Sequence, residues 1–240
     1  MAGGTSGTAD RGAAGADRSL PLRERKRLRT RQSLVATALE RYTRDGFEST
    51  TLDDITDEVE ISKRTFFRYF TSKEDVALAP QKLYWEAHLE LLGELQPSGS
   101  LVEALHRAHA ATLERMDEGW ESQFLVLCRL IGRTPQLAAH SLRHCAETTE
   151  VILALLGERL APLDPSDPRL RIALDIAVSA WRCAVQDWTV QRDGGGDGGG
   201  DGDGDGDGGG RGGLAAHMER AFASVAGALA LTVPAPESLA

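Results

Sequence analysis

The chain has 240 residues, of which 41% are hydrophobic, 26% are charged and nine are proline. These proportions are typical of a globular protein and exclude a proline-rich fibrous chain or a wholly disordered one. The formal net charge of −9 excludes a general nucleic-acid coat, because non-specific affinity for nucleic acids comes largely from Lys and Arg that neutralise phosphates.

Small residues and scattered charges dominate the N-terminus, and we expect residues 1–25 to form a disordered leader. The first 20 residues lack the apolar stretch of a secretion signal, and no later segment offers ~18 uninterrupted apolar residues. We therefore expect a cytoplasmic protein with no membrane partner. Residues 18–31 contain seven Lys and Arg against a single acid, Glu24, and a basic arm of this kind suits a phosphate backbone.

The next segment, residues 26–75, is expected to form a compact domain of short helices. Apolar residues recur at helical spacing from about Thr30, and Gly46 is a candidate C-cap. Thr51-Leu-Asp-Asp54 is typical of a capping box that opens a second helix.

A third and a fourth helix follow after very short turns. Ser62 can cap a helix that runs from Lys63 to about Phe70, and Ser72 begins a second capping box. Phe66 and Phe70 lie one turn apart, so both are expected to face the core, which leaves the first turn of the third helix facing outward. The tight spacing predicts a helix-turn-helix.

The remainder, residues 76–240, is expected to form a larger helical domain. Its amphipathic segments are separated by Gly and Pro and cover about 73–95, 100–116, 121–131, 136–160, 167–191 and 214–231. No alternating strand pattern is present, so the fold class is all-α. Residues 193–213 contain 14 Gly, six Asp and one Arg, and we expect a flexible loop between two packed helices.

Two segments carry the most specific pattern in the chain. They are Gly46-Phe-Glu-Ser-Thr-Thr-Leu-Asp-Asp-Ile55 and Ile61-Ser-Lys-Arg-Thr-Phe-Phe-Arg-Tyr-Phe-Thr-Ser-Lys-Glu-Asp-Val76. Together they resemble the DNA-binding domain of the tetracycline-repressor (TetR) family, in a form common in actinobacteria. The resemblance covers about residues 30–80. It implies an N-terminal three-helix DNA-binding domain followed by a larger helical domain for ligand binding and dimerisation.

The resemblance also implies a set of DNA contacts. Base or backbone contacts would come from the third helix and phosphate contacts from its neighbours: Thr51, Lys63, Arg64, Thr65, Phe67, Tyr69 and Lys73. Packing is the alternative for Phe67 and Tyr69, and an ordinary solvated face is the alternative for Lys63 and Arg64. Two residues depart from the family pattern. Glu60 stands where Gly is usual, which strains a backbone with positive φ by roughly 1 kcal/mol, and Phe67 replaces the more usual Tyr.

The larger domain would enclose an effector pocket, again by resemblance. Its candidate lining is Phe124, Leu127, Cys128, Trp181, Val185 and Trp188. Simple core packing is the alternative for all six. The helices at 167–191 and 214–231 would pair with those of a second copy as a four-helix bundle, with Phe222 and Val225 at the interface.

Other chemistry finds little support in the sequence. The three cysteines, Cys128, Cys145 and Cys183, have no ligand spacing and are expected to be buried, reduced thiols. The Gly/Asp tract fails as an EF-hand, because the Glu due at position twelve is Gly212. No motif of an enzyme is present, so we expect no catalytic residue, no cofactor and no metal.

The sequence therefore predicts a ligand-responsive transcriptional regulator, more often a repressor in this family. Its partners would be double-stranded operator DNA of palindromic sequence, a small and mostly apolar effector, and a second copy of the chain. The alternative is a helical ligand-carrier or interaction protein that retains a vestigial helix-turn-helix.

Overall fold

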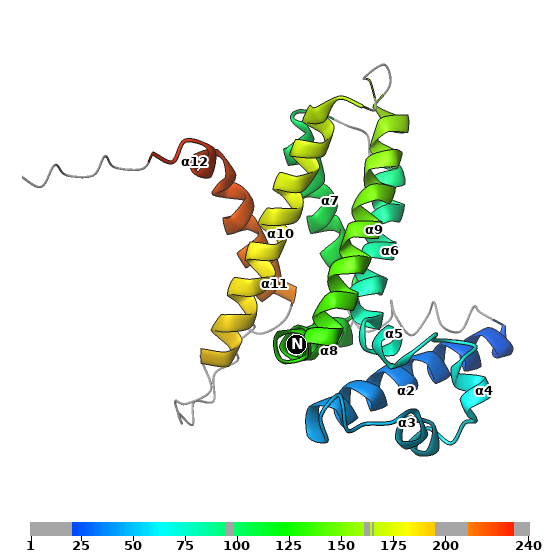
Figure 1. The fold of residues 1–240 in the computed structure, drawn as a ribbon. Coiled ribbons are helices and arrows are strands. Elements are labelled where there is room, and N and C mark those ends of the chain that lie inside the picture. The colour runs from blue at the N-terminus through cyan, green and yellow to red at the C-terminus, as the bar shows by residue number, and fades with distance from the viewer. Residues whose placement is uncertain (1–20, 95–97, 161–163, 165, 195–210, 233–240) are drawn as a thin grey trace, which may run out of the picture. The chain divides into compact units, whose positions relative to one another are not determined.

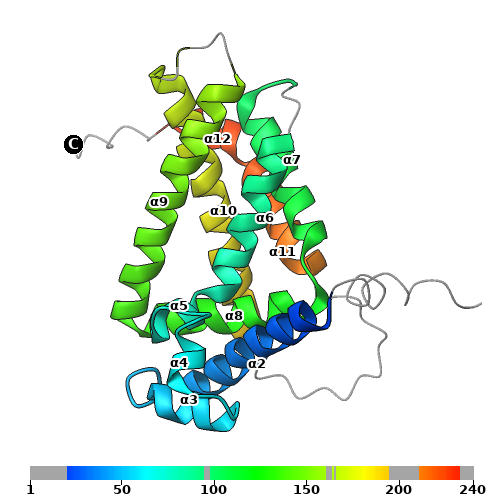
Figure 2. The same ribbon diagram turned by 90° about the vertical axis from the view of Figure 1, so that its right-hand side faces the viewer.

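The structure is a computed structural model that describes residues 21–94, 98–160, 164, 166–194 and 211–232. Every regular element in these ranges is a helix, in agreement with the predicted all-α class (Figure 1, Figure 2). Two compact units divide the chain between Ala79 and Pro80. The predicted leader up to residue 20 and residues 195–210 of the Gly/Asp tract lie outside the described residues.

The first unit contains four helices within its described residues: α2 (Leu22–Arg44), α3 (Leu52–Glu58), α4 (Lys63–Phe66) and α5 (Lys73–Ala77). Helix α2 begins at Leu22, about eight residues earlier than predicted, so residues 22–25 are helical and do not belong to a leader. Arg, Lys and Leu favour helix strongly, but this exposed stretch has no buried stripe. Apolar periodicity, which begins only at Leu34, could not reveal it.

The core of the first unit lies where α2 packs against α3 and α5. Leu34, Ala38 and Tyr42 of α2 are fully buried there, and α3 contributes Ile55. The Tyr42 hydroxyl donates a hydrogen bond to the Lys73 carbonyl oxygen at 3.0 Å, which ties α2 to the start of α5. This core fixes the helix-turn-helix.

Two residues of the first unit have a positive φ, and both stand at helix ends. Gly46 has φ 90° after α2, as expected of a C-cap glycine, and Glu60 has φ 54° after α3. Among the described residues, Glu60 is the only non-glycine with a positive φ. The strain that the sequence predicted for Glu60 is therefore present in the turn of the helix-turn-helix.

The second unit consists of longer helices that follow the predicted segments closely. In its described residues they are α6 (Ala79–Glu94), α7 (Leu101–Arg115), α8 (Glu118–Arg133), α9 (Pro135–Arg159), α10 (Pro168–Gly194), α11 (Arg211–Ala223) and α12 (Val225–Leu229). The predicted helix 214–231 is interrupted at Ser224. The Ser224 hydroxyl donates to the Arg220 carbonyl oxygen at 2.8 Å, so it competes with the regular backbone ladder at this point.

Helix α10 organises the second unit. It packs against α7, α8, α9 and α11, and α11 lies along it in both views (Figure 1, Figure 2). Trp181 and Trp188 of α10 are buried, and the ring of Trp181 stacks on Tyr84 of α6 with centroids 4.4 Å apart. Flat rings from several helices thus fill the centre of this unit.

Candidate DNA interface and regulatory-unit groove

The candidate recognition element, residues 63–69, is a short helix that continues as a series of turns. The Ser62 hydroxyl accepts a hydrogen bond from the Thr65 amide at 3.2 Å and caps α4. Beyond Phe66, the amides of Phe67 and Tyr69 donate to the carbonyl oxygens of Lys63 and Phe66 at 3.0 and 2.8 Å. The element therefore keeps a helix-like course from Lys63 to Tyr69, as predicted.

Opposite faces of this element have opposite character. Phe66 and Phe70 are buried, which confirms that they belong to the core. Phe67 is 54% exposed, and its ring makes an edge-to-face contact with that of Phe66, with centroids 5.5 Å apart. The packing alternative for Phe67 is thus wrong. Tyr69 is half-buried.

The two bases of the first turn differ in their partners. Lys63 is exposed, and its Nζ forms an ion pair with Asp53 of α3 at 2.8 Å. Arg64 is exposed, and no partner for its guanidinium is found among the described residues. Arg64 is therefore available at once to a base or phosphate, whereas Lys63 must first leave a carboxylate.

Thr51 and Lys73, the predicted phosphate contacts, already have structural roles. The Thr51 hydroxyl accepts from the Asp54 amide at 3.2 Å, and the Asp54 carboxylate accepts from the Thr51 amide at 2.8 Å, which completes the predicted capping box. Hydrogen bonds that the Thr51 hydroxyl, at 2.6 Å, and the Thr51 amide donate to the Asp54 carboxylate lower the pKa of Asp54. Lys73 donates from Nζ to the Phe47 carbonyl oxygen at 3.0 Å and lies 4.4 Å from the centroid of the Phe47 ring.

The predicted effector-pocket residues lie together between α8 and α10. Phe124, Leu127, Trp181 and Trp188 are buried, whereas Cys128 and Val185 are half-buried. The Phe124 ring stands 6.4 Å from Trp181 and 6.3 Å from Trp188 between centroids. The Phe124 ring thus lies against both tryptophans, and the role of the six residues in ligand binding stays a prediction.

The cysteines do not all follow the prediction. Burial raises the pKa of the Cys128 thiol to about 12 and also raises that of Cys145, so both thiols stay protonated at neutral pH. Cys183 is exposed, contrary to the expectation that it is buried. It faces away from the unit's core, into a surface groove.

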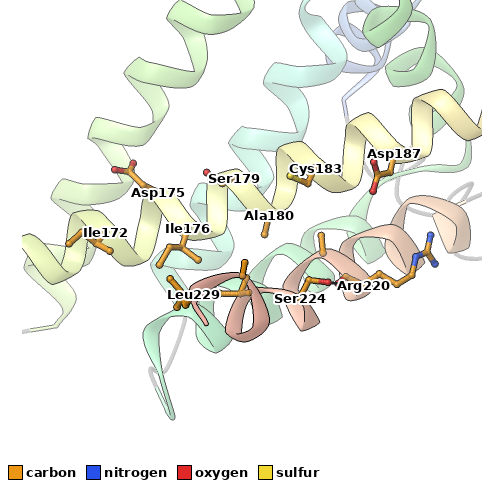
Figure 3. A pocket seen from close by; sticks show the side chains of 13 residues that line it. Ile172, Asp175, Ile176, Ser179, Ala180, Cys183, Asp187, Arg220, Ser224 and Leu229 are labelled. Atoms are coloured by element: carbon orange, nitrogen blue, oxygen red, sulfur yellow. Dashed lines mark hydrogen bonds between the residues drawn. The ribbon is translucent and has the colours of Figure 1, made fainter. Parts of the chain in front are cut away.

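That groove lies between α10 and the consecutive helices α11 and α12, with a volume of about 710 Å³ (Figure 3). Ile172, Ile176 and Leu229 line one end, and Asp187 and Arg220 stand at the other. Ile172 and Leu229 are 57% and 75% exposed, which is unusual for large apolar side chains.

Phe222 does not lie on this surface, contrary to the prediction. It is 8% exposed, and its ring stacks on His106 with centroids 4.5 Å apart, inside the unit. Val225 does line the groove. Phe222 continues the buried stripe of Leu214 and Met218 on α11, so its own unit covers it.

The described residues contain no group of three or more His, Cys, Asp or Glu able to hold a metal ion. His106 and His109, whose spacing suits a metal, have other partners: Nε2 of His106 lies 3.0 Å from Glu219, and Nδ1 of His109 lies 2.6 Å from the Tyr84 hydroxyl. Within the same ranges, no helix is long and apolar enough to span a bilayer.

A capped helix-turn-helix with an exposed basic and aromatic face, joined to a larger helical unit, defines a DNA-binding transcriptional regulator. Residues 34–79 match the model of the bacterial regulatory proteins of the tetR family, and residues 99–196 match the MftR C-terminal domain. The chain therefore belongs to the TetR family, whose members are ligand-responsive DNA-binding regulators and generally repressors.

Two relatives of similar sequence agree with this assignment. The chain is 34% identical over 178 residues to the HTH-type transcriptional regulator TcmR of Streptomyces glaucescens, a match that covers 72% of this chain and 78% of TcmR. It is 29% identical over 135 residues to the mycofactocin biosynthesis regulator MftR of Mycobacterium tuberculosis, covering 56% and 68% of the two chains. Salmonella enterica GusR, a solved structure, is 19% identical with a TM-score of 0.45, covering 85% and 97%.

Proposed function

We propose that the protein is a homodimeric repressor that binds a palindromic operator through α4 and is released by a small, mostly apolar effector. The proposal rests on the presence of two surfaces that no other part of the described chain covers. One is the exposed face of α4, and the other is the apolar groove along α10 to α12. A DNA-binding dimer needs both.

The exposed face of α4 suits the major groove. The Arg64 guanidinium can pair with the O6 and N7 acceptors of guanine, and Thr65 can bond to a base or a phosphate. Phe67 has no hydroxyl, so its exposed ring can only make apolar contacts, such as one with the methyl group of thymine. Tyr69, Thr51 and Lys73 would contact the backbone at the edges of this surface.

The groove suits a second copy of the chain. A two-fold axis through it would place the same face on both subunits, so that Ile172 and Leu229 of each copy are covered by the other. The result is a four-helix bundle with apolar residues at one end and Asp187 and Arg220 at the other. Such a dimer holds two α4 elements at a set spacing, as half-sites about one helical turn (~34–36 Å) apart or a multiple of it require.

The proposed effector site is the space between α8 and α10 that Phe124, Trp181 and Trp188 now fill. An apolar ligand that separates these rings would favour one arrangement of the second unit over another, and hence one spacing of the DNA-binding units. The function involves no chemical step, so no enzymatic activity is proposed. A regulator that binds the bacterial chromosome acts in the cytoplasm.

The dimer is tested by placing a charge in the groove. Ile172→Asp and Leu229→Asp should convert the protein to a folded monomer in sedimentation at micromolar concentration, and should weaken binding to DNA from upstream of its own gene in mobility-shift assays. Leu142→Asp is the matched control, because Leu142 is equally exposed (60%) but lies on α9 outside the groove. Dimers of full DNA affinity in both groove variants would show that the subunits pair elsewhere.

A further inference from the structure

A second basic surface lies on the first unit, next to the end of the recognition element. It is a groove of about 690 Å³ between the first turns of α2 and the turn after α4. Its lining residues are Pro21, Arg23, Glu24, Lys26, Arg27, Thr30, Arg68 and Tyr69. Four of these eight residues are cations and one is an acid, so the groove attracts anions.

Three of the cations form one stripe on α2. Arg23, Lys26 and Arg27 are three and four residues apart, a spacing that places them on the same face of a helix, and Thr30 continues the stripe one turn on. All three cations are exposed. Like charges at this spacing repel each other, so the stripe is unfavourable in the free protein and an anion would relieve it.

The cations of this groove differ from several other cations of the first unit in having no carboxylate partner among the described residues. Lys63, Lys73 and Arg44 each have a carboxylate partner, namely Asp53 at 2.8 Å, Glu48 at 3.9 Å and Asp45 at 2.9 Å. In the described part of the chain, none of the four cations in the groove has an ion pair with a carboxylate, Glu24 included. Their charge is therefore uncompensated within those residues.

We propose that this groove binds the phosphate backbone of the DNA that flanks each half-site, outside the base pairs that α4 reads. The inference rests on the proposed placement of α4 in the major groove. From Lys63 to Tyr69 the recognition element rises about 10 Å at ~1.5 Å per residue, which is close to the ~12 Å width of the major groove. With Lys63 and Arg64 on the bases, Arg68 and Tyr69 reach the edge of the groove, where a phosphate strand runs.

The contact is independent of base sequence, because phosphates are the same at every step. Arg68 and Tyr69 would hold the strand from the side of the recognition element, and Lys26 and Arg27 from the side of α2. Affinity therefore depends on the length of DNA beyond the half-sites and on salt, but not on the flanking sequence. This extends the DNA interface beyond the helix-turn-helix to the first turns of α2.

The experiment uses the full chain and a duplex that it selects from a random-sequence library. The duplex is trimmed to the outermost base pair of the two half-sites, or extended by six base pairs on each side with either of two unrelated sequences. Wild-type protein should bind both extended duplexes equally and more tightly than the trimmed one. A K26Q/R27Q variant, which removes both charges but keeps polar side chains of similar helix propensity, should lose this gain without a fall in its melting temperature.

Salt dependence gives the size of the effect. Each lost phosphate contact flattens the slope of log affinity against log salt by about 0.9, so two contacts in each of two subunits change it by roughly 3.6. A four-fold rise in salt should then weaken wild type on the extended duplex roughly 150-fold more than it weakens the variant. R143Q is the matched control, because Arg143 is an exposed base of α9 in the second unit, and it should behave as wild type.

The remaining outcomes separate the inference from the proposed function. An equal loss of affinity by K26Q/R27Q for trimmed and extended duplexes would overturn the inference. The two charges would then attract DNA in general and would not bind the flanking phosphates. Unchanged affinity of K26Q/R27Q for every duplex would overturn the inference too. In either case, weaker binding of R64Q to all duplexes would still support the proposed contact of α4 with the bases. If R64Q bound as tightly as wild type, the placement of α4 and the inference that rests on it would both be wrong.

Discussion

The imidazole rings of His88 and His109 lie stacked in the core of the second unit, with centroids 4.1 Å apart and planes 20° from parallel. Both side chains are almost fully buried. Nδ1 of His88 lies 2.9 Å from the Thr112 hydroxyl, and Nδ1 of His109 lies 2.6 Å from the Tyr84 hydroxyl. Burial lowers the pKa of His88 to about 4, and burial and the neighbouring His88 lower the pKa of His109.

This pair predicts that the second unit is destabilised by acid. In the unfolded chain a histidine binds a proton below pH ~6.5, whereas folded His88 stays neutral down to about pH 4. As the pH falls through that window, the free energy of unfolding should decrease by about 1.4 kcal/mol per pH unit for each such histidine. Urea unfolding followed by tryptophan fluorescence at several pH values measures this free energy. The signal reports on the second unit, because it contains all four tryptophans, Trp85, Trp120, Trp181 and Trp188. His88→Gln should reduce this dependence of the unfolding free energy on pH.

Replacing Glu60 by glycine should stabilise the first unit by about 0.5–1 kcal/mol, because glycine adopts φ 54° without the strain of a side chain. Hydrogen exchange of amides in residues 34–79 is the suitable measurement, since this unit contains no tryptophan. Glu60→Ala is the control, because it removes the carboxylate but keeps Cβ. An equal gain from both substitutions would assign the effect to charge and not to backbone strain.

The two faces of α4 should respond differently to alanine. Arg64→Ala should weaken specific DNA binding by about 1–3 kcal/mol and leave the melting temperature unchanged, because the side chain is exposed. Lys63→Ala should do the same with a smaller loss, since Lys63 must leave Asp53 before it binds DNA. Phe66→Ala should instead lower the stability of the first unit by about 3–5 kcal/mol, because it empties a fully buried site. Melting temperatures and binding isotherms of the three variants test this. If only Phe66→Ala reduced DNA affinity, and the variant stayed folded, the assignment of Phe66 to the core side and of Arg64 to the DNA side would be contradicted.

Substitutions at Val225 of α12 and Phe222 of α11 should have different effects. Val225→Asp should give folded monomers, because Val225 lines the groove proposed for the second subunit. Phe222→Ala should lower the free energy of unfolding of the second unit by about 3–5 kcal/mol, because its ring packs against His106 inside that unit. Sedimentation together with tryptophan-detected unfolding distinguishes the two results. A destabilised monomer from Val225→Asp would place that residue in the core as well.

The sequence predicted most of the helices and the inward face of α4, because capping boxes and apolar periodicity are local signals. The family resemblance marked Glu60, which stands where Gly is usual, and the structure gives this residue a positive φ. Local signals failed at the start of α2, where an exposed helix has no apolar stripe, and at Phe222, where an apolar residue can be covered by its own unit or by a partner. Periodicity tells which residues avoid water, but not which surface covers them. The ion pair of Lys63 with Asp53 and the groove at Arg68 depend on contacts between helices, which no single segment encodes.

The Lys63–Asp53 ion pair bears on how quickly the protein can search a chromosome. Any stretch of DNA offers phosphates, but in the proposed interface only an operator also offers base contacts to Arg64 and Phe67. Because Asp53 competes for the Lys63 ammonium, random DNA gains little from displacing it and is released sooner. The residence time on wrong sequences shortens, which frees the protein to search further. The operator complex bears the same cost, but the proposed base contacts of Arg64 and Phe67 still hold it.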